Sequence, residues 1–252
     1  MPSEVGEPSS PSSDRDDQNT ATLGVNVVGV VTDELTAIRA SWSAFEYEML
    51  LSDLQQIGPI VGLPAYAHGQ PGVWLRHDVE LDADAALVIA QTEHRMGLAS
   101  TYFVCADSPF LHADEVRLLL PRLRDLGHEI GLHRIWGLES TEERWHFFGF
   151  MRNETQNVTF HAPGVPPWRL AAHPAGAVVY SNLANGVGSY ASDSTGRWRW
   201  GNPKEASAKG LPLQVLTHPF WWSGGEKDLR ALGASWRAFL PQIANPKDRN
   251  AP

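Results

Sequence analysis

The feature that most constrains this fold is a regular alternation of short apolar runs with longer segments of helical periodicity. The apolar runs predict six buried strands, at residues 72–77, 99–104, 129–133, 157–161, 188–192 and 213–217. The helical segments lie at residues 36–57, 82–96, 113–126, 141–150 and 235–243. Strands and helices that alternate in this way are typical of a parallel sheet whose strands are joined by right-handed crossovers.

The number of strand–helix units predicts an α/β domain, built either as a barrel or as an open doubly wound sheet. The chain has 252 residues, 42% of them hydrophobic, which is sufficient for one substantial core. We expect a single domain at residues 23–244. Residues 1–22 are rich in Ser, Pro and acidic residues and are expected to be disordered, and residues 245–252 are expected to fray.

Charge and cysteine content narrow the choice of partner and compartment. The formal net charge is −9 and Lys and Arg form no cluster, so we expect no nucleic-acid partner. Cys105 is the only cysteine, which precludes an internal disulfide and fits a reducing compartment. With no signal-peptide pattern and no run of about 18 apolar residues, we expect a cytoplasmic protein without a transmembrane segment. No sequence feature indicates the oligomeric state.

Ionisable residues stand at the ends of five predicted strands, where parallel α/β folds form their functional sites. These candidates are Asp78, Glu80, His133, His161, Asp193 and His218. Asp78 and Glu80 are two residues apart and share a face of an extended strand, whereas His77 points the other way, toward the helix layer. His128 lies in the turn after Gly127 and is expected to be structural.

This combination of side chains points to metal-dependent hydrolysis. Imidazoles and carboxylates together suit zinc or a similar divalent ion, which acidifies a bound water and polarises a carbonyl. A carboxylate can accept a proton while a second His protonates the leaving group, as amide or ester hydrolysis requires. The absence of HExxH, paired CxxC, Walker, GxSxG and GxGxxG motifs argues against zincins, zinc fingers, P-loop enzymes and nucleophile-elbow hydrolases.

Six segments carry a family resemblance. They are Leu75-Arg76-His77-Asp78-Val79-Glu80, EHRMGLASTYF at 93–103, GHEIGLH at 127–133, FHAP at 160–163, YASDS at 190–194 and LTHP at 216–219. In this order they resemble motifs of the polysaccharide deacetylase family, the NodB-homology domain of carbohydrate esterase family 4. The first segment is most similar to a divergent branch of that family whose first motif reads RHDVD.

The resemblance implies a distorted (β/α) barrel of about seven parallel strands and metal-dependent removal of acetyl groups from N-acetylated sugars. By position, Asp78 corresponds to the base and His133 to a metal ligand. His218 corresponds to the catalytic acid, and Asp193 to the Asp that orients it.

The sequence also departs from the family pattern. Val79 stands in place of a metal-binding Asp, and Gly137 in place of a second His. His161 occupies the position of an Arg and could supply the missing imidazole. The metal set is therefore expected to be His133 with Asp78 or Glu80, and His161, and Asp78 is either base or ligand.

Further residues are candidates for substrate binding, and several functions remain open. Trp221, Trp222 and Arg197 lie next to the last two motifs and could line a carbohydrate site, although packing explains the two Trp residues equally well. The favoured function is a zinc-dependent deacetylase acting on a polysaccharide or a sugar precursor. The alternatives are an inactive carbohydrate-binding descendant of the fold and a hydrolase of small non-sugar amides.

Overall fold

The fold was analysed in a computed structural model. The structure describes residues 42–135, 149, 151, 155, 157–162, 166–172, 177–194, 196–198, 201–223, 234–236 and 238–239. All of them belong to one compact unit, Ile38–Pro252. The expected tails at 1–22 and 245–252 lie outside the described residues, as does Gly137. Of the helix expected at 141–150 only Gly149 is described, and it is helical.

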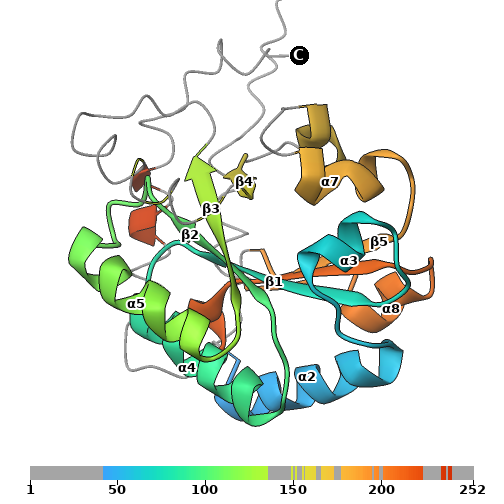
Figure 1. The fold of residues 1–252 in the computed structure, drawn as a ribbon, viewed down its shortest axis with the longest axis horizontal. Coiled ribbons are helices and arrows are strands. Elements are labelled where there is room, and N and C mark those ends of the chain that lie inside the picture. Colours follow the sequence, from blue (N-terminus) through green and yellow to red (C-terminus); the bar gives the residue numbers. More distant parts are fainter. Residues whose placement is uncertain are drawn as a thin grey trace, which may run out of the picture. The chain divides into compact units, whose positions relative to one another are not determined.

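A curled parallel sheet of six strands organises the domain (Figure 1). Its order is β4-β3-β2-β1-β6-β5, and every neighbouring pair is parallel. The strands are β1 (Val73–Val79), β2 (Thr101–Cys105), β3 (Glu129–Ile135), β4 (Val158–His161), β5 (Ser189–Ser192) and β6 (Leu213–Thr217). Each coincides with one of the six strands predicted from the sequence.

The expected distorted (β/α) barrel of about seven strands is confirmed only in part, because in the described part of the chain the sheet is a six-stranded half-barrel with β4 and β5 as its edges. The alternation of strands and helices was compatible with six or seven units, and the six runs with strand-like patterning are the ones that form strands. The α/β class and the parallel pairing are confirmed.

Helices form where capping residues and apolar periodicity coincide. They are α2 (Ala44–Ile57), α3 (Leu63–Ala67), α4 (Ala83–Arg95), α5 (Ala113–Asp125), α7 (Ala177–Ala184) and α8 (Pro203–Ser207), with 3₁₀ turns η1 (Pro167–Ala172) and η2 (Pro219–Trp221). Ser43 and Glu46 form a capping box that fixes the start of α2, eight residues after the predicted start. Asp82 caps α4 by accepting bonds from two backbone N–H groups. Within the described residues, no helix has the length and apolar character needed to cross a membrane.

The two faces of the sheet carry separate apolar clusters. Helices α2, α4 and α5 cover one face, which we call the outer face, and pack on β1 residues such as Val73, Leu75 and Val79. Helices α3 and α7 and turn η1 cover the inner face, where Trp74 and Phe103 are buried. The alternation of side chains along β1 therefore decides which residues enter each layer.

The inner face is layered along β1 from Trp74 through Arg76 and Asp78 to Glu80. In the layer nearest the start of β1, the indole N–H of Trp74 donates to the hydroxyl of Thr101 on β2 at 2.9 Å. Above it, the ring of Phe103 lies against Gly131, where an added Cβ would come within 2.1 Å of the ring. Only glycine fits beside this ring, and the interior is therefore filled below the carboxyl end of the sheet.

Candidate functional site

Three ionisable side chains from three different strands converge at the carboxyl end of the sheet. Glu80 directly follows β1, His133 lies in β3 and His161 ends β4. Oε1 of Glu80 is 3.1 Å from Nε2 of His133 and 2.7 Å from Nδ1 of His161. Since β2 lies between β1 and β3, the side chain of Glu80 spans a strand to reach His133.

Thr159 fixes the orientation of the His133 ring. Its Oγ1 lies 2.7 Å from Nδ1 of His133, and the two residues are paired in the β3–β4 register. When Nδ1–H of His133 donates a hydrogen bond to this hydroxyl, the lone pair of Nε2 points toward Glu80. A hydrogen bond to the distal ring nitrogen is the usual support of a metal-binding His.

Glu80 carries a negative charge in this buried setting. Burial by itself raises the pKa of Glu80, but the facing His161 and His133 outweigh it and hold the pKa well below its usual range. The cluster therefore combines one carboxylate with two imidazoles.

The geometry of this cluster fits a divalent metal ion. One donor atom from each of Glu80, His133 and His161 lies within 4.8 Å of the others. In a tetrahedral zinc site with bonds of about 2.0–2.1 Å, neighbouring donors are about 3.3 Å apart, somewhat wider than the Glu80 contacts of 3.1 and 2.7 Å. Three protein ligands of these types leave a fourth position for water. These side chains could therefore hold a metal ion.

Asp193 and His218 form a second buried pair, at the ends of β5 and β6. Nδ1 of His218 lies 2.6 Å from Oδ1 of Asp193, and the backbone N–H of His218 donates to both carboxylate oxygens. Burial lowers the pKa of His218, but Asp193, with smaller contributions from Glu80 and Asp78, raises it to about 9. His218 is therefore a cation at neutral pH and can act as a proton donor.

Asp78 lies beside the metal-capable cluster rather than in it. Its Oδ2 is 3.6 Å from Nδ1 of His133, on the side of the ring away from Glu80. Its Oδ1 is 3.2 Å from Nη1 of Arg76. Among the described residues, the donor group consists of Glu80, His133 and His161, and this arrangement leaves Asp78 available for another role.

Arg76 and Thr159 are site residues that the sequence analysis missed. Arg76 is 2% exposed and lies over the rings of Phe103 and Tyr180, at 5.6 and 5.5 Å from their centroids. Both residues had a detectable signal. Arg76 is a charged residue in a buried strand, two positions before Asp78, and Thr159 precedes His161 by two positions on the same strand face.

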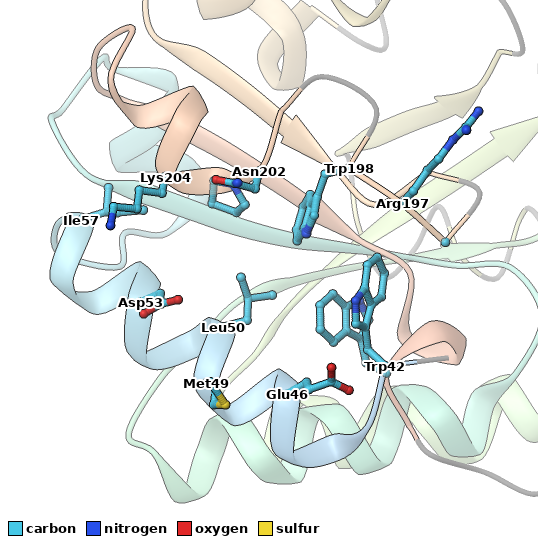
Figure 2. Close-up of a pocket in the computed structure, with 13 residues that line it drawn as sticks. Trp42, Glu46, Met49, Leu50, Asp53, Ile57, Arg197, Trp198, Asn202 and Lys204 are labelled. Carbon is cyan, nitrogen blue, oxygen red and sulfur yellow. The ribbon is translucent and has the colours of Figure 1, made fainter. Parts of the chain in front are cut away.

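The residues proposed for substrate binding occupy different environments. Trp222 is buried, and its indole N–H donates to Oδ2 of Asp193 at 2.6 Å. Trp221 is also buried and packs on Phe220, with ring centroids 4.2 Å apart. Arg197 lies in the turn after β5, and Figure 2 shows its side chain pointing away from the other labelled residues. Trp222 thus holds Asp193, and neither ring is open to solvent.

Two further histidines lie where the sequence predicted them. His77 points to the outer face, where its Nε2 is 2.8 Å from Oε1 of Glu93 on α4 and its Nδ1 is 2.7 Å from Thr217. Nε2 of His128 is 3.0 Å from the backbone oxygen of Ala90. Both contacts are structural and lie on the face opposite the candidate site.

Comparison with known proteins identifies no relative. No protein-family model, curated protein or solved structure matches this chain.

Proposed function

We propose that this protein is a metal-dependent hydrolase that removes amide-linked acetyl groups from a polysaccharide or a sugar precursor. The observation that carries the proposal is the meeting, at one end of the sheet, of a donor set suited to zinc with a buried His–Asp pair. Glu80 and Asp78 both act on the charge of His218, so the two groups share one electrostatic environment. Amide hydrolysis needs both parts close together.

Each side chain has a distinct role in the proposed reaction. Glu80, His133 and His161 would hold a divalent ion, which would supply Lewis-acid chemistry toward the acyl carbonyl and the attacking water. Asp78 accepts the proton of the attacking water. The imidazolium of His218 donates its proton to the departing amine nitrogen, and Asp193 holds that imidazole in place.

The sugar substrate and the zinc ion are the finer parts of the proposal. Acetylated sugar is supported by the motif resemblance at residues 75–80 and 127–133, and zinc by the two-imidazole, one-carboxylate donor set. The buried Val79 belongs to the outer core, and we propose that Glu80 provides the carboxylate missing at that position.

The test combines metal analysis with acetate release from N-acetylglucosamine oligomers. We expect the purified protein to contain about one equivalent of zinc. It should release acetate, and this activity should stop when a chelator removes the metal. His133→Ala should lose both metal and turnover, whereas His218→Ala should keep the metal and lose at least a hundredfold in rate. His68→Ala, an exposed histidine outside the site, is the matched control and should change neither.

The outcomes separate the competing functions. Acetate release that persists in chelated, metal-free protein would overturn the metal role. A protein that binds zinc and oligosaccharide but releases no acetate would instead be a binding module built on the same fold.

A further inference from the structure

A cavity of about 530 Å³ lies between α2 and the segments around residues 196–198 and 202–204 (Figure 2). It is separate from the metal-capable cluster, whose three residues do not line it. Cavities of this size are typical of small-molecule sites. The nature of its lining indicates what it can bind.

Three tryptophans form the aromatic part of the lining. Trp42 stacks on Trp222 with centroids 4.1 Å apart and planes 15° apart, and Trp198 lies 6.0 Å from Trp42. Trp222 is the buried member of this stack, whereas Trp42 and Trp198 are both partly exposed. Figure 2 shows Trp198 on the side of the cavity that faces α2, near Leu50. A flat ligand face can therefore contact an indole surface here.

The polar part of the lining carries both signs of charge. Asp53 comes from α2, and Asn202 and Lys204 come from the start of α8. Together they offer carboxylate acceptors, amide donors and ammonium donors around one space. Such a mixed rim favours an uncharged ligand with several hydroxyl groups over an anion or a cation.

We propose that this cavity is a carbohydrate-binding site that takes a pyranose ring. The C–H face of a pyranose matches the partly exposed indoles of Trp42 and Trp198, and its hydroxyl edge matches the mixed polar rim. The choice of an N-acetylated sugar as ligand rests on the proposed function, whereas the choice of a pyranose ring rests on the lining of the cavity.

The cavity is linked to the candidate catalytic pair through Trp222. The indole N–H of Trp222 donates to Asp193, which in turn holds His218. A sugar that packs on the partly exposed ring of Trp42 would therefore press on the stack that contains the indole holding Asp193. We therefore expect a sugar bound in the cavity to affect the Asp193–His218 pair.

The experiment is isothermal titration calorimetry of the 252-residue chain with chitotriose, the trimer of N-acetylglucosamine. We expect Trp198→Ala to raise the Kd at least tenfold and Asp53→Ala to raise it severalfold. His133→Ala should retain the Trp198-dependent binding, because the cavity does not depend on the metal-capable cluster. Phe45→Ala is the matched control, since this exposed aromatic lies on α2 outside the cavity and should leave the Kd unchanged.

Two results would overturn the proposal. One is a Kd that is the same in wild type, Trp198→Ala and Asp53→Ala, and the other is binding that disappears in His133→Ala alone. Circular dichroism checks that Trp198→Ala is folded. If it is not, the test uses Asp53→Ala and Lys204→Ala, because both positions are exposed.

Acetate release measured on the same trimer separates this proposal from the proposed function. Acetate release together with binding that does not depend on Trp198 would contradict the cavity site and support the hydrolase. Binding that depends on Trp198 without acetate release would contradict the hydrolase and support the cavity site.

Discussion

Arg76 brings a positive charge into the middle of the inner face, where Asp78 is its ion-pair partner. Arg76→Met would leave the carboxylate of Asp78 buried without that partner. We expect this change to destabilise the protein by about 3–5 kcal/mol, the usual cost of breaking a buried ion pair from one side. Urea denaturation measures the difference.

The double substitution Arg76→Met with Asp78→Asn is the control for this prediction. It removes both charges, and we expect it to recover part of the lost stability because no uncompensated charge remains. If Arg76→Met alone costs less than about 1 kcal/mol, the ion pair is not what stabilises this layer.

The protonation of His218 gives a second prediction for a single residue. Its pKa in the folded protein is about 9, above the usual value of 6.5, so its stabilising contribution is complete below pH 6.5 and is lost as the pH rises through 9. Asp193→Asn removes the main cause and should move the midpoint well below 9. An NMR titration of the metal-free protein follows the ring protons, and an unchanged midpoint in Asp193→Asn would contradict the assignment.

The elements on the outer face are joined through one carboxylate. Glu93 on α4 accepts hydrogen bonds from Tyr47 on α2 at 2.5 Å, from Tyr102 on β2 at 2.8 Å and from Ser100 at 2.7 Å. His77 on β1 is 2.8 Å away. This single residue therefore fixes α2 and α4 against β1, the strand that carries Asp78 toward the site.

Acid sensitivity should reveal this connection. Burial raises the pKa of Glu93, but His77, His128 and the Tyr47 hydroxyl lower it to about 2. Its stabilisation of about 3 kcal/mol is therefore lost as the pH falls from 4.5 to 2. Glu93→Gln should be destabilised by a similar amount at pH 7, and its difference from wild type should shrink in acid. Urea denaturation across this range is the measurement. Glu48→Gln, on the exposed ion pair with Arg95, should change stability by less than about 0.5 kcal/mol.

The elements differ in how far the sequence could predict them. All six strands were predictable, because buried parallel strands are short continuous apolar runs, and the two-residue period placed Asp78 and Glu80 on one face. The contacts of Glu93 depend on how α4 packs on the sheet, which no local pattern encodes. The pairing of His133 with Thr159 depends on strand register, and sheet closure depends on curvature rather than strand count.

For the whole molecule, metal binding and folding should be thermodynamically linked. A ligand that binds only the folded protein stabilises it by about 2.7 kcal/mol at a hundred times its Kd. In a chain of this size we expect zinc to raise the Tm by about 5–10 °C. The shift, measured by scanning calorimetry, should disappear in His161→Ala and persist in His94→Ala, an exposed histidine of α4. A rise of equal size in His161→Ala would place the ion elsewhere.

The layering of the inner face has a consequence for changes in the length of β1. Every second residue of β1 faces the inner side of the half-barrel. One amino acid inserted ahead of Arg76 would therefore exchange the inward-facing and outward-facing side chains that follow it. His77 and Val79 would then face the interior, and both carboxylates would point at the helices. A change in the length of β1 would therefore displace every side chain of the strand at once, whereas a replacement alters a single layer.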